Sequence, residues 1–162
     1  SCDAGYQPVP VSFDGSALFE SSYMPLIEDR LYYYQRLSAV KSVDDVSMVR
    51  LEVLDRFGKM TTKVENLFYV SGVRVCFKFC FPRRVLFKNN TMSIELDGLP
   101  DGISEQGFVL FVAKVEKSVG QKAKVEHLPS GGLAVRFFNL GVKGGVVACT
   151  AFDLLFSRAI TK

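Results

Sequence analysis

Tryptophan is absent from this 162-residue chain, and histidine occurs once, at His127. The four cysteines, Cys2, Cys76, Cys80 and Cys149, are too few and too irregularly spaced for the disulfide framework of a small secreted domain. We therefore expect reduced thiols and an intracellular protein, and the sequence does not indicate the compartment. No apolar run approaches the roughly 20 residues that a membrane-spanning helix requires, so we expect no membrane span.

The same scarcity argues against an enzyme. A Cys or Ser nucleophile would need His127 as its base, and partners such as Cys149 can be named in any chain of this length. One histidine and no closely spaced cysteine pair do not provide a zinc or other transition-metal centre. The loop at 97–105 offers fewer oxygen ligands than calcium requires. The sequence therefore predicts a non-enzyme without cofactor or metal, and an enzyme built on His127 and a thiol is the least favoured alternative.

What the chain does contain is typical of a folded, soluble domain. Hydrophobic residues make up 48% and charged residues 23% of the sequence, and phenylalanine alone accounts for 14 positions. The first fifteen residues include Pro8 and Pro10, so residues 1–15 are expected to form an extended arm, and residues 16–162 a single β-rich domain. Within that domain, apolar residues from Phe19 to Leu37 recur at three- and four-residue steps, which predicts a helix at about 24–40.

Beyond Ser47, most segments resemble short strands separated by turn residues. Gly58 and the pair Asn89-Asn90 suit tight turns, and no later segment shows a clear helical stripe. Sequential strands without crossover helices favour antiparallel pairing. We therefore predict a mainly β fold, an antiparallel β-sandwich or barrel of about eight strands with one N-terminal α-helix. The alternation does not separate sandwich from barrel.

The segment 72–84, "GVRVCFKFCFPRR", shows the strongest alternation. As a strand it would bury three phenylalanines and two valines on one face, and burial of each is worth roughly 1.5 to 3 kcal/mol. The other face would carry Arg74, Cys76, Lys78 and Cys80. Two strand residues four positions apart lie roughly 13 Å apart, too far to share a metal ion or a disulfide. We interpret the two cysteines as small apolar residues on a half-covered face.

Two surfaces are candidates for binding. The first is the run Tyr32, Tyr33 and Tyr34, because three consecutive helical residues cannot all face the core, and an exposed tyrosine is a common interface anchor. We favour a non-catalytic interaction or assembly module that acts through protein–protein contacts with a partner or through self-association.

The second candidate surface is basic. Residues 1–56 hold nine acids against five bases, whereas residues 57–162 hold eight acids against fifteen bases. A basic strand face could bind single-stranded nucleic acid, as an alternative to protein binding. The residues concerned are Arg74, Lys78, Arg83, Arg84, Lys88, Lys122 and Lys124. β-sandwich domains with a basic face and an arm also occur in virus structural and transport proteins, but this analogy of fold identifies no family.

Overall fold

The computed structural model describes residues 7–160, and within that range five α-helices accompany one open five-stranded sheet. The prediction of a mainly β sandwich or barrel with one helix is therefore wrong. The architecture is α/β. No helix in the described range is long and apolar enough to cross a bilayer.

The elements follow one another along the chain, and the longest connection joins β1 to α1. The helices are α1 (Ile27–Ala39), α2 (Val43–Phe57), α3 (Thr62–Val75), α4 (Glu105–Val119) and α5 (Gly145–Ile160), with a 3-10 turn η1 (Val142–Gly144) before α5. The strands are β1 (Val11–Phe13), β2 (Arg84–Lys88), β3 (Thr91–Leu96), β4 (Ala123–His127) and β5 (Leu133–Phe138). The helix expected at 24–40 is present as α1.

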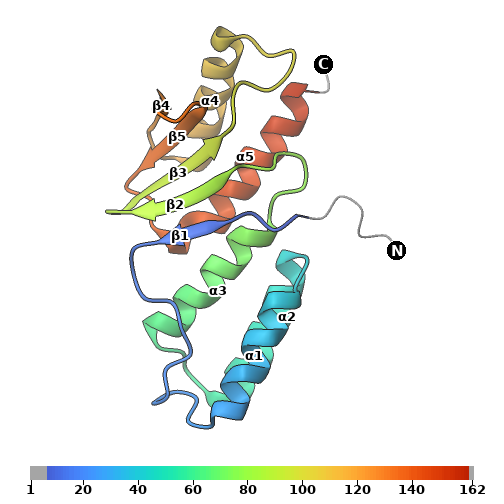
Figure 1. Ribbon diagram of the computed structural model, residues 1–162, viewed down its shortest axis with the longest axis vertical. Coiled ribbons are helices and arrows are strands. Elements are labelled where there is room, and N and C mark those ends of the chain that lie inside the picture. The colour runs from blue at the N-terminus through green and yellow to red at the C-terminus, as the bar shows by residue number, and fades with distance from the viewer. Residues whose placement is uncertain (1–6, 161–162) are drawn as a thin grey trace.

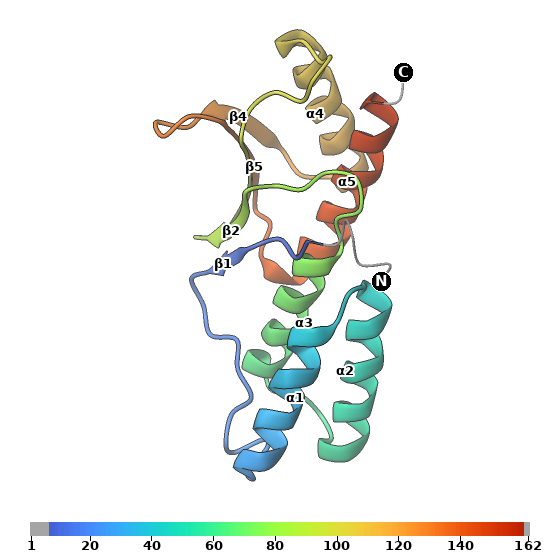
Figure 2. The same cartoon turned by 45° about the vertical axis from the view of Figure 1, so that its right-hand side comes forward.

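The molecule is elongated, with a helical end and a sheet end (Figure 1). Helices α1, α2 and α3 pack around one apolar cluster that includes Tyr33, Val53 and Phe68. Helices α4 and α5 cover one face of the sheet over a second cluster that includes Ile94 and Phe152. The opposite face of the sheet carries no helix (Figure 2), and we call it the open face.

The strand order in the sheet is β1-β2-β3-β5-β4. Strand β1 runs parallel to β2, and every other neighbouring pair is antiparallel. Asn89 and Asn90 form the β2–β3 turn with φ of 52° and 55°, as their sequence predicts. Of the expected arm, residues 1–6, and Cys2 with them, lie outside the described range, while Val11–Phe13 joins the sheet as β1.

The strand expected at 72–84 is not formed. Helix α3 continues to Val75 and a loop follows, in which Phe77 is buried while Phe79 and Phe81 are 51% and 46% exposed. The side chain of Asp153, on α5, is buried and holds this loop. Its carboxylate accepts hydrogen bonds from the backbone N–H groups of Lys78 (2.9 Å), Phe79 (2.9 Å) and Cys80 (2.7 Å). The loop backbone thus bonds to a side chain instead of a strand.

Four segments expected to be strands are the helices α2, α3, α4 and α5, and the first three of these begin with an N-cap signal. The side-chain hydroxyls of Ser42, Thr61 and Ser104 accept hydrogen bonds from backbone N–H groups three residues ahead, at the starts of α2, α3 and α4. Gly58 and Gly120 end α2 and α4 with φ of 82° and 79°. Gly58 is therefore a helix C-cap and not a hairpin turn.

Candidate functional site

Helix α2 exposes apolar side chains that the core does not use. Its inner side packs three valines into the helical cluster. Met48, Leu51, Glu52 and Asp55 follow at steps of three and four residues, so they share one outward stripe. Met48 is 65% and Leu51 58% exposed. Large apolar residues that gather on an exposed helix face within a polar rim are characteristic of an interaction surface.

Helix α1 continues this surface. Arg36 forms an ion pair with Glu52, and its guanidinium lies 5.7 Å from the centre of the Tyr32 ring, which is 48% exposed. Both views show α1 and α2 side by side at the end of the molecule away from the sheet (Figures 1 and 2). We define the α1–α2 face as Tyr32, Arg36, Met48, Leu51, Glu52 and Asp55.

The α1–α2 face is acidic around its apolar centre. A hydrogen bond with Tyr33, together with the charges of Arg36 and Arg56, lowers the pKa of Glu52. Asp55 makes no ion pair with any other described residue. The face therefore carries two acidic side chains and one guanidinium, and Glu52 is the one that pairs with Arg36.

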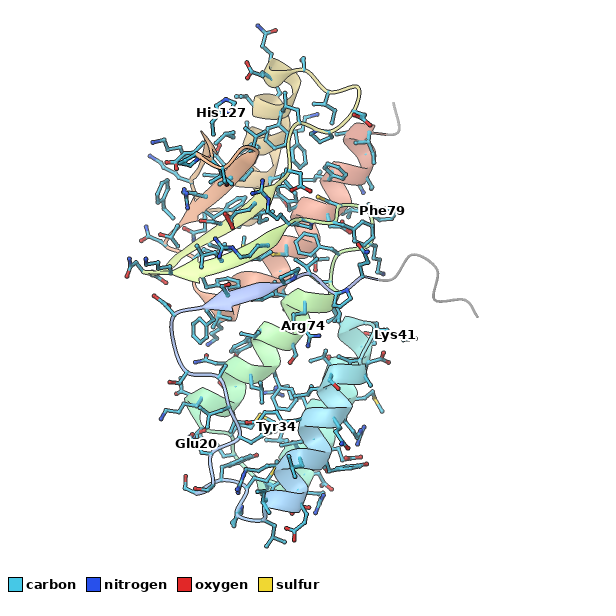
Figure 3. The ribbon with its side chains drawn as sticks, in the orientation of Figure 1. Glu20, Tyr34, Lys41, Arg74, Phe79 and His127 are labelled. Atoms are coloured by element: carbon cyan, nitrogen blue, oxygen red, sulfur yellow. The ribbon has the colours of Figure 1, made fainter. Side chains whose placement is uncertain are left out.

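The other two predicted tyrosines serve the fold. Tyr33 is fully buried, its hydroxyl accepts a hydrogen bond from Arg56 Nη1 at 3.0 Å, and burial raises its pKa. The Tyr34 hydroxyl accepts a hydrogen bond from the Phe19 backbone N–H at 2.9 Å, and the two rings lie 4.9 Å apart. Tyr34 therefore ties α1 to the segment before it (Figure 3). Of the three, Tyr32 is the one placed on the α1–α2 face.

Only part of the predicted basic set converges. Val85 and Phe87 face the helices, so Arg84 and Lys88 lie on the open face of the sheet. Lys124 pairs in register with Arg136 on the same face. The remaining members are dispersed. Arg74 lies in the last turn of α3 (Figure 3), Lys78 in the following loop, Arg83 beside Asp97 at 2.9 Å, and Lys122 just before β4.

Acidic partners offset much of this charge. Arg84 Nε lies 2.5 Å from a carboxylate oxygen of Glu95, and Arg136 Nε lies 2.7 Å from one of Glu126. Lys124 shares Glu126 at 3.2 Å. The open face is therefore a network of mixed charge. Arg136 was not in the predicted basic set, although strand alternation with the buried neighbour Val135 places its side chain on the open face.

His127 and the thiols lie in different environments. His127 projects from the sheet edge (Figure 3), with Nε2 3.7 Å from Glu105 Oε1. Cys149 is buried with Sγ 3.6 Å from Met92 Sδ, and burial raises its pKa. Cys76 and Cys80 are also buried, not on a half-covered face. Within residues 7–160, no thiol hydrogen-bonds to His127 and no His, Cys, Asp and Glu side chains form a group able to hold a metal.

Comparison with known proteins identifies a family whose model matches this chain. The TRCF domain family model matches residues 13–102, which include α1, α2 and α3. A curated relative, the transcription-repair-coupling factor of Buchnera aphidicola subsp. Acyrthosiphon pisum (strain APS), is 28% identical over 69 residues, which are 43% of this chain and 8% of that protein. The chain thus spans a small part of that relative. The crystal structure of a C-terminal domain of transcription-repair coupling factor shares the fold, with a TM-score of 0.69, 16% identity, and coverage of 96% of this chain and 95% of that one.

Proposed function

The chain belongs to the TRCF domain family, and we propose that it is a non-catalytic protein-interaction domain that docks a partner on the α1–α2 face. The observation that carries the proposal is the exposure of Met48 and Leu51 on a well-formed helix that already has a complete inner stripe. Both helices of the face fall within the residues that the family model matches. The surface therefore lies in the part of the chain on which the family assignment rests.

The chemistry of the face indicates what its partner must offer. Leu51 and Met48 would supply buried contact area at the centre, while Asp55 and Glu52 would attract basic side chains around it. Tyr32 is a rigid aromatic ring held beside Arg36, a residue type that often carries binding energy at interfaces. The partner we propose is a protein surface with an apolar centre flanked by Arg or Lys.

The name of the curated relative suggests the process in which such a contact is made. That relative is a transcription-repair-coupling factor, of which the matched region is a small part. We propose that this chain acts as one domain in the same process, and that the protein it binds is a component of transcription-coupled DNA repair.

Site-specific photocross-linking tests the proposal even while the partner is unidentified. A benzophenone amino acid would replace Leu51 in one variant and Val147 in another. Val147 is a matched control because it is a 75% exposed apolar residue on α5. After irradiation in an extract of the cells that produce this protein, we expect a discrete protein adduct from position 51 and none from position 147. Addition of Asp55→Lys should abolish the adduct, because it reverses one charge of the rim.

The result that contradicts the proposal is equally distinct. Equal adducts from both positions would indicate nonspecific contact, and no adduct from position 51 in active extract would show that the face does not dock a protein. An adduct that persists with Asp55→Lys would contradict the proposed electrostatic match. Each variant should retain the circular dichroism and unfolding midpoint of the original chain, because the altered side chains are exposed.

A second candidate function, binding of single-stranded nucleic acid, is favoured by one observation. Arg84, Lys88, Lys124 and Arg136 share the open face, and the ring of Phe138 there is 41% exposed. Fluorescence anisotropy with a labelled oligonucleotide at low salt tests it. Binding that weakens steeply with salt and is lost in Lys88→Glu would support this function, and no binding at low salt would remove it.

A further inference from the structure

Strand β4 has an edge without a neighbouring strand among the described residues. It ends the sheet next to β5, as both ribbon views show (Figures 1 and 2). The Phe138 N–H donates to the Lys122 carbonyl at 2.9 Å, and the Leu128 N–H donates to the Gly132 carbonyl at 3.0 Å. Because antiparallel ladders alternate, residues 122, 124, 126 and 128 direct their backbone groups toward β5, and residues 123, 125 and 127 direct theirs outward.

Most of these outward groups are free to pair. The Ala123 N–H already donates to the Glu116 carboxylate at 3.0 Å. Within residues 7–160, the N–H groups of Val125 and His127 have no acceptor. The edge therefore offers two donors and the three carbonyls of Ala123, Val125 and His127, and an edge of this kind is a template for another strand.

The side chains on this edge complement themselves. Lys124 and Glu126 lie on the open face, with Nζ and Oε1 3.2 Å apart. If a second β4 ran antiparallel with the two Val125 residues opposite each other, each Lys124 would face Glu126 of the second copy. Opposite charges directly across two strands stabilise the pair, whereas like charges destabilise it. A lone edge lysine would repel the same lysine of a second copy, but here each Lys124 would lie opposite Glu126 of the second copy and attract it.

An apolar surface adjoins the same edge on the helix side. There, α4 exposes Val109 (56%) and Leu110 (66%). A hollow of about 570 Å³ lies between α4 and the strand, and Val125, Val109 and Leu133 contribute to its walls. In the antiparallel arrangement the two α4 helices would lie on the same side of the joined sheets, where Val109 of each copy would be covered. Exposed apolar surface and unpaired backbone thus coincide at one edge.

We propose that two copies of this chain pair through β4, antiparallel and with Val125 on the two-fold axis, to join their sheets. Each Val125 N–H would donate to the Val125 carbonyl of the second copy, and each His127 N–H to the Ala123 carbonyl. The outward Ala123 N–H stays bonded to Glu116. The inward bonds of β4 to β5 are unaffected, because they are made by residues 122, 124, 126 and 128. This interface lies on the sheet, away from the α1–α2 face, so it extends the proposed function and does not depend on it.

Sedimentation velocity of the full chain across a wide concentration range tests the pairing. We expect the sedimentation coefficient to rise from that of a monomer to that of a dimer. Val125→Pro should hold the chain as a monomer, because it removes an outward N–H and no internal bond. Lys124→Glu should do the same by setting two carboxylates against each other in each half of the interface. The double variant Lys124→Glu/Glu126→Lys restores opposite charges across the axis and should recover the dimer.

Controls separate loss of pairing from loss of fold. Lys59→Glu makes the same charge reversal at an exposed site between α2 and α3 and should leave the dimer intact. Each variant should keep its circular dichroism spectrum, and Lys124→Glu remains informative if Val125→Pro fails to fold. A wild-type chain that stays monomeric at all concentrations would overturn the proposal. A dimer that survives Lys124→Glu, or a folded double variant that stays monomeric, would overturn it as well.

Discussion

Replacement of Asp153 by alanine is expected to lower the free energy of unfolding by about 3–5 kcal/mol. Its carboxylate is the common acceptor for three backbone N–H groups of the loop after α3, at 2.7–2.9 Å, and the residue is 3% exposed. Hydrogen bonds to a charged group are worth about 1.5–3 kcal/mol each, and donors left unsatisfied in the interior add a cost. Water can reach the part of the loop near Phe79, which keeps the total below the full sum.

The assay is urea denaturation followed by circular dichroism, with Asp101→Ala as the matched control in an exposed loop. The control should change stability by less than about 0.5 kcal/mol. Asp153→Asn should fall between the two, because the amide keeps one oxygen acceptor and turns an NH₂ group toward the donors. Amide exchange of Phe79 and Cys80 should accelerate in both Asp153 variants. A loss below about 1 kcal/mol for Asp153→Ala, with those amides still protected, would refute the reasoning.

Two further predictions test the sheet-side core. Burial, reinforced by the charge of Asp153, raises the pKa of Cys80 from 9.0 to about 12, so at pH 8 its thiolate fraction is about 1000-fold below that of a free thiol, and iodoacetamide should spare it in the native chain. Because this folded-state pKa exceeds the unfolded one, the free energy of unfolding should decline as the pH rises from about 9 towards 12. Rapid alkylation of Cys80 in the native chain, measured by mass spectrometry, would contradict the raised pKa on which both predictions rest. Gly145→Ala should lower the free energy of unfolding by about 1–3 kcal/mol, since the added Cβ would lie 2.6 Å from a ring carbon of Phe87. Gly98→Ala, which meets nothing within 4 Å, should be near neutral, and equal losses in the two variants would show that the helix–sheet contact is looser than the structure indicates.

The sequence reveals the helices whose apolar stripes are large and uniform, and hides the others. Helix α1 was recognisable because aromatic and aliphatic residues recur along it. The buried stripe of α5 includes Gly145, Ala148, Cys149 and Asp153, whose small or polar side chains obscure a regular helical period. In α5 the strongly apolar outward residues, such as Val147, then suggest a strand.

The segment 72–84 shows a different source of error. Its alternation arises where a helix end joins a loop. Val73 and Val75 are buried residues of α3, and Phe77 is a buried residue of the loop. Nothing local distinguishes this from a strand, because the group that holds the loop, Asp153, lies more than seventy residues away. By contrast, Ser104 and Gly120 are local start and stop signals for α4, so the two ends of this helix are marked in the sequence.

The candidate site was only partly predictable for a related reason. A tyrosine run predicts that at least one ring is exposed, and Tyr32 (48%) is the most exposed of the three, followed by Tyr34 (37%). Met48 and Leu51 look like core residues in the sequence, because residue type alone does not distinguish an apolar side chain on the surface from one in the interior. Their exposure becomes apparent only when α2 is packed by its valines.

The dissociation constant of the partner captured through position 51 tests the central claim most directly. Isothermal titration would compare the original chain with Met48→Ala/Leu51→Ala and with the control Val147→Ala. We predict that the double variant, still folded, binds at least about 30-fold more weakly, the loss of about 2 kcal/mol that marks an interface hot spot. The control should bind as the original does. A change of less than about threefold in the double variant, or an equal loss in the control, would contradict a docking role for the α1–α2 face.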